Sequence, residues 1–546
     1  MPTDALYSAL SIWPMLPEMV LCAAGCAALL TSNARNETLR RAAPAIALAA
    51  LVVGVLLLRG WPTVLAPMLG MGETIVGGGL ELGHFAEFVR VSALVLGVLF
   101  VLTSWSLPSH RETGEYFCML LFSVAGLMLV GSASDLVILF MALELVSVPT
   151  YVMVTLSRSN PRGLEAGTKY FYLGAMAAAV TAYGFAFLYG ATGQASIAGS
   201  IGILSDILTR PTGPAYVIAT IGLVLSIGGL LFKLAAFPLH FYVADVYQGA
   251  AAPVAGLLGF VPKAAGIVAV IKIIEMTGWR TDAGGLFWML WWVAALSMTI
   301  GNTLALRQTN IKRMLAYSGI AHAGYMLVGI LAGPAAGGML GDGAAAALYY
   351  VVIYGIANLG AFVVLGLLHV NGEPCETLRD VAGLLRRQPG LAWLLALTMF
   401  TLMGLPPTPG FWGKLSLFGS ALSTATAVGG VDRTWVIVLV IVALINSAIG
   451  AAYYLRVAAA VLLYENEEPA EALPREEQRT GAVLCGLLLL IFMVYPNVLL
   501  DAGQVATSHL RVYSYGTAQH DAPPSASDLE ASQRASRDSG NAHRPG

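Results

Sequence analysis

The chain has 546 residues, of which 57% are hydrophobic and only 11% are charged, and its formal net charge is −2. A typical soluble domain carries roughly 25% charged residues, so this composition excludes an ordinary soluble protein. The small net charge also gives no sign of a nucleic-acid partner. Apolar runs repeatedly reach about 20 residues, the length of a helix that crosses a bilayer, and they are continuous rather than alternating. The sequence therefore predicts an all-α integral membrane protein, in which strands are not expected.

The apolar runs, separated by turn and loop signals, predict about 14 membrane spans. The first ten residues, MPTDALYSAL, lack the basic start of a cleaved signal peptide, so the first run is expected to remain as a span. In chain order the predicted spans cover 7–30, 43–59, 88–106, 116–131, 135–156, 164–191, 215–237, 252–275, 285–306, 314–332, 344–370, 390–421, 434–463 and 481–500.

Loop charge predicts how these spans are oriented. The loops after spans 1, 3, 5, 9, 11 and 13 hold most of the loop arginines and lysines, such as Arg40, Lys312 and Arg387. Because positive loops stay in the cytoplasm, both termini and the Gly-rich segment 60–87 are expected on the non-cytoplasmic side. From Tyr513 the chain is rich in Ser, Ala, Pro and Asp, which predicts a disordered polar tail.

The cysteines give no sign of a metal or redox centre. No CxxC pair or Cys/His cluster with metal-ligand spacing occurs, and no GxGxxG or P-loop signature is present. We therefore expect no metal, iron–sulfur cluster, haem or flavin in this chain. The five cysteines are Cys22, Cys26, Cys118, Cys375 and Cys485.

Two predicted spans contain prolines that must interrupt the helix. Span 7 runs into LFKLAAFPLHFY, where Lys233 precedes Pro238, and span 12 contains GLPPTPGFWGKLSLFGS, where Pro407 and Pro409 precede Lys414. Proline removes a backbone donor and clashes with the preceding turn. Paired broken helices in two halves are typical of inverted-repeat transporters, so spans 4–8 and 9–13 are predicted to be the repeats. Lys414 would then repeat the environment of Lys233.

This organisation divides the chain into five parts. The two predicted repeats form the centre, a group of three spans precedes them, and a last span and the polar tail follow. The parts are residues 1–115 (spans 1–3), 116–275 (first repeat), 285–463 (second repeat), 464–512 (loop and last span) and 513–546 (tail).

Four charged residues lie deep inside apolar segments: Glu144, Lys233, Lys263 and Lys414. An ionised side chain at the bilayer centre costs about 2.5–3.5 kcal/mol on insertion scales, so such residues usually face protein or water and mark an ion path. A lysine near Glu144 would keep that carboxyl charged. Two structural alternatives remain open, a helix–helix hydrogen bond for Glu144 and a fixed ion pair for Lys233.

Two histidines and several other polar residues extend this row. His322 shares a helix face with Ser318 and Tyr325 and could relay protons, or it could be a hydrogen-bonded packing residue. His240 follows Lys233 by seven residues, although the intervening proline could turn it away. Weaker stripes, which could line a water path or only join helices, are Tyr350, Tyr354 and Asn358, and Asn446 and Tyr453.

Two further residues lie beside the central lysine in sequence. Pro262 directly precedes Lys263 and is expected to loosen the local helix. Lys272, near the end of the same span, is expected to reach the membrane surface and receives no role. One carboxylate with several cationic groups suits proton transfer and does not suit a metal cage, which needs several oxygen ligands.

Three segments resemble a known family. FKLAAFPLHFYVADVYQGAAAPVAGLLGFVPKAAG, NTLALRQTNIKRMLAYSGIAHAGYMLVG and GLPPTPGFWGKLSLF closely resemble the antiporter-like membrane subunits of respiratory complex I. The VYQGA–PV segment and the short chain are similar to the subunit N type of bacterial NADH–quinone oxidoreductase, a relative of mitochondrial subunit 2. The resemblance covers roughly residues 5–510. Ala244 and Gly319 stand where relatives usually have proline and often serine.

The resemblance implies a proton-translocating subunit with fourteen helices in two inverted five-helix repeats. Electron transfer from NADH to quinone, with FMN and iron–sulfur clusters, would occur in other subunits and drive proton pumping here, so this chain would hold no cofactor or metal. Its partners would be a neighbouring antiporter-like subunit, small membrane subunits and the lipid of the bacterial inner membrane. The implied relay residues are Glu144, Lys233, Lys263 and Lys414, with His322 and His240 less certain in role.

Two other functions remain open at this point. The chain could belong to a multi-subunit cation/proton antiporter without redox coupling, against which the VYQGA–PV segment argues. It could also be a non-conducting structural subunit, against which four buried charges argue. Sodium in place of protons is not excluded by the residues alone.

Overall fold

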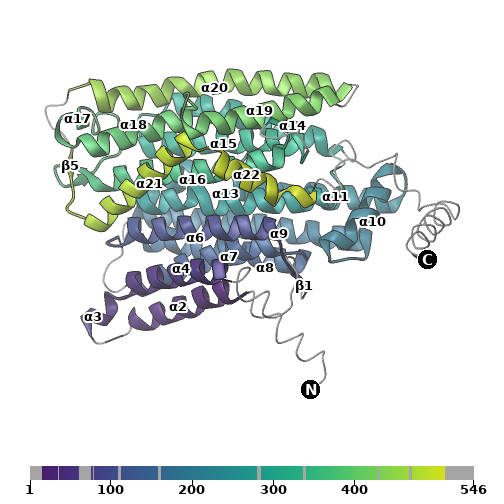
Figure 1. Ribbon diagram of the computed structural model, residues 1–546, viewed down its shortest axis with the longest axis horizontal. Coiled ribbons are helices and arrows are strands. Elements are labelled where there is room, and N and C mark those ends of the chain that lie inside the picture. The colour runs from purple at the N-terminus through teal and green to yellow at the C-terminus, as the bar shows by residue number, and fades with distance from the viewer. Residues whose placement is uncertain are drawn as a thin grey trace, which may run out of the picture.

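The computed structural model describes residues 15–32, 34, 36–60, 75–77, 79–107, 112–157, 161–279, 285–335, 340–427, 431–465 and 470–510. Long helices lie side by side in a bundle (Figure 1). Eleven helices in the described ranges are long and apolar enough to cross a membrane, which confirms the predicted helical membrane protein. The predicted tail from Tyr513 and the beginning of the first predicted span lie outside the described residues.

A described helix lies within every predicted span range, and several further elements lie between the spans. They are α2 (Leu16–Ser32), α3 (Glu37–Arg40), α4 (Ala43–Gly60), α6 (His84–Ser104), α7 (Thr113–Ser132), α8 (Leu136–Leu156), α9 (Pro161–Thr192), α10 (Ile197–Thr209), α11 (Pro214–Leu234), α12 (Val243–Gly249), α13 (Ala252–Glu275), α14 (Leu286–Leu306), α15 (Ile311–Ala332), α16 (Gly343–Leu367), α17 (Leu384–Arg387), α18 (Pro389–Met403), α19 (Pro409–Ala427), α20 (Val431–Leu463), α21 (Glu476–Val494), α22 (Asn497–Ala506) and the 3₁₀ turn η5 (Ser508–Leu510).

Short strands occur in the connections between helices, where none was expected. β1 (Ile75–Gly77) and β2 (Leu80–Leu82) pair antiparallel, and β3 (Leu368–Val370) lies between β4 (Glu373–Pro374) and β5 (Glu471–Ala472). The expectation of no strands was therefore wrong for the loops. Strands of two or three residues are too short to produce an alternating hydrophobic pattern, which explains why the sequence did not reveal them.

Polar residues fix the starts of three central helices. The side chains of Asp135, Asn310 and Asp342 precede α8, α15 and α16, and each accepts a hydrogen bond from a backbone N–H of the first turn, at 2.7, 3.1 and 2.8 Å. Such N-caps satisfy donors that have no partner within the helix. The caps hold these helices in register at the membrane boundary, and two of the three helices carry residues of the predicted row.

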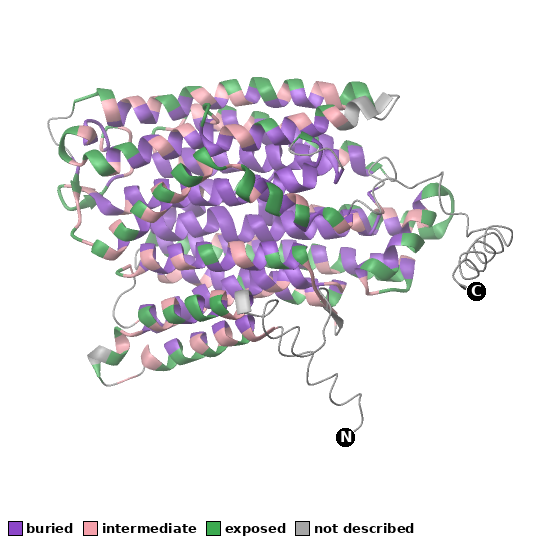
Figure 2. Cartoon of the chain, viewed as in Figure 1, coloured by how far each residue is buried: buried purple, intermediate pink, exposed green. Residues whose placement is uncertain are grey.

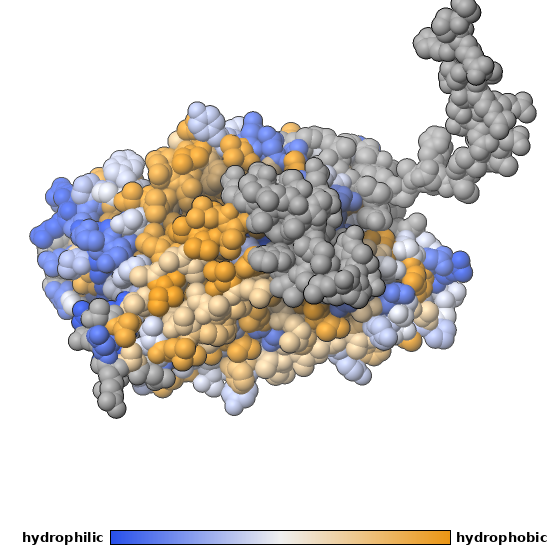
Figure 3. Space-filling model, turned by 60° about the horizontal axis from the view of Figure 1, so that its bottom comes forward, coloured by the Kyte–Doolittle hydropathy of each residue, from blue (hydrophilic) through white to orange (hydrophobic). Residues whose placement is uncertain are grey.

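The centre of the bundle consists of α13, α15 and α16. In the most apolar 18-residue stretch of each helix, all residues are buried in α13 and 94% are buried in α15 and in α16. Only 28% of the residues are buried in the corresponding stretches of α20 and α21 (Figure 2). The outer helices expose large apolar side chains such as Leu56, Leu444 and Leu490. Figure 3 shows a broad apolar belt between polar ends, as expected for a surface that faces lipid.

Both predicted helix breaks are present, and Pro262 does not interrupt its helix. The chain leaves α11 at Leu234 and re-enters a helix at Val243, and it leaves α18 at Met403 and re-enters at Pro409. By contrast, α13 continues through Pro262 as one helix, so this proline does not break it. Neighbouring helices that enclose α13 can support it where proline removes one internal bond.

Candidate functional site

The first part of the site joins α8 to the end of α11. The amine Nζ of Lys233 lies 3.3 Å from Oε1 of Glu144, and the two side chains are 7% and 25% exposed. Lys233 also donates to the carbonyl of Leu143 at 3.2 Å and to the hydroxyl of Ser147. The predicted pair between Glu144 and Lys233 is therefore present, and three oxygen atoms surround the lysine amine.

The break after α11 creates a second lysine site. Pro238 stands four residues after Leu234 and has no N–H, so the Leu234 carbonyl cannot form the usual helical hydrogen bond. Nζ of Lys263 donates to this carbonyl at 2.9 Å and to the carbonyl of Gly319 at 2.7 Å. A helix C-terminus carries partial negative charge, so its last carbonyls favour a cation there. The break thus positions the central lysine.

The second break holds Lys414 in a similar way. Its Nζ donates to the carbonyl of Met403 at 2.7 Å and to the hydroxyl of Ser447 at 2.9 Å. Met403 is the last residue of α18, and Pro407 stands four residues later. As at the first break, a lysine binds a helix-end carbonyl that a proline leaves without its helical partner.

The predicted equivalence of Lys414 and Lys233 was wrong. Lys233 precedes its break and is paired with a carboxylate, whereas Lys414 follows its break and binds only neutral oxygens among the described residues. Its contacts match those of Lys263 instead. The order of lysine and proline in the sequence already indicates this difference, because Lys233 stands before Pro238 whereas Lys414 stands after Pro409.

His322 lies between these lysine sites. Its two ring nitrogens are each 2.8 Å from a tyrosine hydroxyl, that of Tyr350 and that of Tyr454. Two more tyrosine rings contact the imidazole, Tyr354 at 4.8 Å and Tyr325 at 5.7 Å between ring centroids. All four tyrosines are buried.

The tyrosine rings on His322 also face the two lysines. Nζ of Lys263 lies 5.8 Å from the centroid of the Tyr354 ring, and Nζ of Lys414 lies 4.9 Å from that of Tyr325. An ammonium over a tyrosine face is attracted by the ring quadrupole. The described contacts therefore form a continuous series of five side chains: Lys263, Tyr354, His322, Tyr325 and Lys414.

A small cavity adjoins both lysines of the first half. Its volume is about 10 Å³, close to the space for one water molecule, and its lining includes Lys233, Lys263 and the rings of Tyr170, Tyr242 and Tyr247. The structure thus places the two amines beside a common internal space.

The second predicted histidine is not part of this arrangement. His240 lies between α11 and α12, and its ring packs against that of Phe237 at 5.7 Å. None of the contacts described for it reaches the lysines or His322. The turn that follows the helix break carries this side chain away from the face of Lys233, as the sequence allowed.

Several polar residues of the site were not singled out from the sequence. Ser447 binds Lys414, and the Ser297 hydroxyl accepts the N–H of Phe237 at 2.9 Å within the first break. Asn302 donates to the Tyr325 hydroxyl at 3.1 Å and accepts from Tyr453 at 3.0 Å. Asn302 and Ser297 belong to the same apolar span, and their spacing of five residues gives no shared helix face that could have revealed them.

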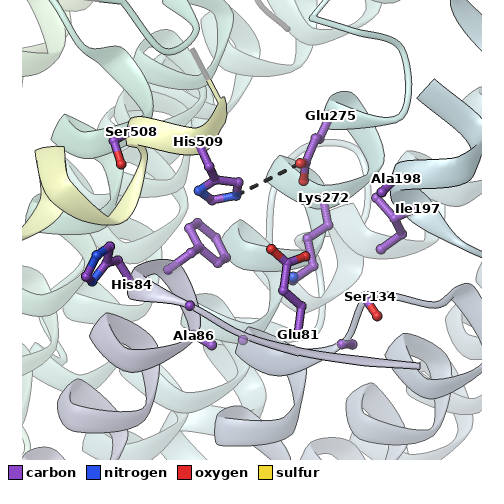
Figure 4. Close-up of a pocket in the computed structure, with 14 residues that line it drawn as sticks. Glu81, His84, Ala86, Ser134, Ile197, Ala198, Lys272, Glu275, Ser508 and His509 are labelled. Atoms are coloured by element: carbon purple, nitrogen blue, oxygen red, sulfur yellow. Dashed lines mark ion pairs between the residues drawn. The ribbon is translucent and has the colours of Figure 1, made fainter. Parts of the chain in front are cut away.

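A separate group of ionisable residues surrounds the end of α13 (Figure 4). A pocket of about 90 Å³ is lined by Glu81, His84, Lys272, Glu275 and His509, among others. Lys272 is 7% exposed, so the expectation that it reaches the surface was wrong. Its amine lies 5.1 Å from the Phe85 ring centroid, and Nε2 of His509 lies 4.0 Å from Oε1 of Glu275. The residues that line this pocket lie far apart in sequence, so no single segment of the sequence predicts it.

Neither region has the donor set of a metal site. In the described part of the chain, no group of three or more His, Cys, Asp or Glu side chains is arranged to hold a metal ion. The amines of the row are bound by carbonyl and hydroxyl oxygens, and its imidazole by phenols. Such groups can hold and exchange protons.

Known proteins share this sequence and fold. Residues 133–445 match the family described as NADH:quinone oxidoreductase/Mrp antiporter, TM. NADH-quinone oxidoreductase subunit N from Trichlorobacter lovleyi is 36% identical over 471 residues, which cover 85% of this chain and 90% of that protein. A chain of respiratory complex I from Thermus thermophilus with bound aureothin is 31% identical with a TM-score of 0.70, over 90% of this chain and 99% of that chain.

A more distant structure shares the fold alone. A chain of the Mrp complex from Dietzia sp. DQ12-45-1b has a TM-score of 0.74 at 19% identity, over 92% of this chain and 97% of that chain. Fold similarity therefore does not separate the two kinds of complex, since another chain of respiratory complex I from Thermus thermophilus is also only 18% identical, with a TM-score of 0.71. On sequence, fold and coverage together, the chain belongs to the subunit N family of the NADH-quinone oxidoreductases.

Proposed function

We propose that this chain is a proton-translocating membrane subunit of respiratory complex I. Electron transfer from NADH to quinone in other subunits drives protons through it along Glu144, Lys233, Lys263, His322 and Lys414. The observation that carries this proposal is the series of ionisable groups through the bundle, in which Lys263 and Lys414 each bind a carbonyl at a broken helix. The membership of the subunit N family supports the coupling to NADH oxidation.

The chemistry of the row favours protons over metal cations. Sodium or another hard cation needs several oxygen ligands around one point. The row instead contains one carboxylate, three amines and one imidazole, and the amines would repel a metal ion. Each amine donates to a fixed carbonyl, of Leu143, Leu234 or Met403. A carbonyl can accept a hydrogen bond from either the ammonium or the neutral amine, so it can hold the lysine in place while its charge changes.

The finer architecture is proposed on the same grounds. The chain has fourteen spans, and its repeats run from α7 to α13 and from α14 to α20, each with one broken helix. The domain limits are residues 1–115, 116–275, 285–463, 464–512 and 513–546. Helix breaks of this kind persist in a membrane only where protein or a wet cavity covers them, as around Lys263 and Lys414.

The orientation and surroundings follow from charge and family. α3, α17 and β5 lie at one end of the bundle with the Arg-rich loops, and β1 and α10 lie at the other (Figure 1). The Arg-rich end faces the cytoplasm of a bacterial cell, and both termini lie outside it. Other membrane subunits of the complex are the partners, above all a neighbouring antiporter-like subunit, and NADH, FMN, iron–sulfur clusters and quinone act in other chains.

The two other candidate functions receive less support. A subunit of an Mrp-type antiporter would fit the fold equally well, but the relative from Trichlorobacter lovleyi, 36% identical over 85% of this chain, is a subunit N of NADH-quinone oxidoreductase. A structural subunit would have no reason to bury four charged side chains at the cost that a bilayer imposes.

Replacement of Lys233 by Met tests the proposal. The assembled complex is placed in vesicles, and proton pumping is measured during NADH oxidation by quinone. Pumping should fall by roughly ten-fold or more, because the variant removes the group that exchanges protons with Glu144. Lys169→Met is the matched control, since Lys169 is an exposed lysine of α9 paired with Glu165 and Asp245. Unchanged pumping in an assembled Lys233→Met complex would contradict the proposed proton relay.

A further inference from the structure

Tyr354 carries a buried hydroxyl without a hydrogen-bond partner among the described residues. The residue belongs to α16 and is 2% exposed. Buried hydroxyls in native proteins nearly always bind a protein group or an ordered water, because burying one without a partner is costly. Three other tyrosines around the same histidine are all partnered, Tyr350 and Tyr454 by the imidazole and Tyr325 by Asn302. Among the four tyrosine hydroxyls around His322, that of Tyr354 is therefore the one without a hydrogen-bond partner in the described residues.

Tyr354 lies where the row is interrupted. The ring of Tyr354 separates Lys263 from His322, at 5.8 Å from the amine and 4.8 Å from the imidazole centroid. His322 cannot bind the lysine directly, because both of its nitrogens are occupied by other phenols. A proton that travels from Lys263 to the histidine group must pass this tyrosine.

Gly319 is what allows the lysine and the hydroxyl to approach each other. A Cβ added to Gly319 would lie 2.7 Å from Oη of Tyr354 and 3.4 Å from Nζ of Lys263. Both polar groups therefore border the same small region beside this glycine. The ammonium group of Lys263 has three N–H donors, and two of them bind the carbonyls of Leu234 and Gly319. One donor of the lysine and the free hydroxyl thus remain beside the same residue.

We infer that Tyr354 is a proton-relay residue, and that its hydroxyl, with one water beside Gly319, completes the hydrogen-bonded link from Lys263 to the His322 group. The inference rests on the proposed function and adds a residue that the row of charges does not contain. Gly319 acts as a positioning residue, since the lack of a side chain lets the Tyr354 hydroxyl and the Lys263 amine lie close to the same backbone position.

The transfer balances without an ionised phenol. The Lys263 ammonium gives a proton to the water, and the water gives one of its own to Oη of Tyr354. In the same step the phenol releases its own proton, and one hydroxyl bonded to His322, that of Tyr350 or that of Tyr454, takes it up and gives its own proton to the ring nitrogen that it contacts. Lys263 ends as the neutral amine, and the proton ends in the histidine group.

Tyr354→Phe tests the role of the hydroxyl, because it removes one oxygen and keeps the ring between Lys263 and His322. The assembled complex is reconstituted in vesicles, and proton pumping, the pH profile and the solvent isotope effect are measured during NADH oxidation. Pumping should fall by roughly ten-fold, with a larger isotope effect, since a proton step becomes limiting. Tyr349→Phe is the matched control on the same helix, because it loses only a hydrogen bond to the Pro409 carbonyl.

Gly319→Ala separates the relay from simple packing. The methyl carbon of alanine would lie 2.7 Å from Oη of Tyr354 and would displace the hydroxyl, so this variant should also pump slowly. Adding Tyr354→Phe removes the oxygen that the new methyl group meets. The relay predicts that the double variant stays as slow as Tyr354→Phe alone, whereas a packing clash predicts that the double variant recovers.

Lys263→Met distinguishes failure of the relay through Tyr354 from failure of the proposed function. If Lys263→Met stops pumping and Tyr354→Phe pumps at the rate of the Tyr349→Phe control, the relay through Tyr354 is wrong and the proposed function stands. Normal pumping by assembled Lys263→Met overturns the proposed function itself.

Discussion

At the scale of single residues, a fixed carbonyl oxygen accompanies each lysine of the row. Leu234 and Met403 are the last residues of their helices, and each stands four residues before a proline, Pro238 or Pro407. The proline removes the N–H that would otherwise compete for the carbonyl. This rule needs only the sequence, and it could have located both acceptors. The identity of the lysine that fills each site could not be predicted, because Lys263 reaches its carbonyl from another helix.

Glu144→Gln tests the carboxylate at this scale. The variant keeps the side chain's size and removes the charge beside Lys233, while the Leu143 carbonyl and Ser147 hydroxyl remain. Proton pumping by the assembled complex should fall by roughly ten-fold or more, since the lysine loses the group that favours its charged form. Glu165→Gln, an exposed carboxylate paired with Lys169, is the control and should pump normally. Equal pumping by both variants would refute the role of Glu144.

At the scale of elements, α13 matters most because the bundle encloses it completely. It carries the central lysine, and it meets α16 at Gly259, where an added Cβ would lie 1.8 Å from Nδ2 of Asn358. Such proximity requires glycine, so the packing of the two helices depends on this position. The helix periods of the sequence predicted both elements, but they did not predict that these two helices would touch.

Gly259→Ala should therefore destabilise the subunit by about 1–3 kcal/mol, the usual cost of overpacking. Gly228→Ala is the control, because nothing lies within 4 Å of its added Cβ, and replacing a helical glycine there should be neutral or slightly stabilising. Thermal denaturation of the purified complex and the yield of assembled subunit measure the difference. Equal stability of the two variants would show that α13 and α16 do not pack as described.

The docking of the C-terminal elements α22 and η5 should depend on pH. Burial lowers the pKa of His509 below its usual value of 6.5, while Glu81 opposes this and Lys272 adds to it. Because the docked state favours the neutral imidazole, docking is fully stable above about 6.5 and weakens as the pH falls below that value. The protection of residues 497–510 against hydrogen exchange, measured relative to the intrinsic exchange rate at each pH, should decrease at lower pH, and His509→Gln should lose this dependence. Protection that stays constant in the native chain would contradict the assignment.

The differences between prediction and structure also belong to this scale. The helix breaks followed from proline chemistry, and the row of charges followed from the cost of burial. The continuity of α13 through Pro262, the burial of Lys272 and the oxygen contacts of Lys414 depend on neighbouring helices. Such tertiary contacts leave no period or motif in the sequence.

At the scale of the whole molecule, an apolar belt separates two polar ends, and the Arg-rich loops gather at one of them (Figure 3). Cysteines introduced at Glu373 and Thr212, which are exposed at opposite ends, test the orientation. An impermeant thiol reagent added outside intact cells should label Thr212→Cys and leave Glu373→Cys unlabelled, because positive loops stay in the cytoplasm. The reverse pattern would invert the topology and the direction of the proposed path.

The central claim is that protons cross this subunit through the buried row. The number of protons pumped per NADH oxidised, measured in vesicles that contain the assembled Lys263→Met complex, tests it most directly. The account predicts that this ratio falls, or that coupled NADH oxidation stops together with pumping, because the middle of the row no longer holds a proton. An assembled variant that keeps both the native ratio and the native rate would contradict the account.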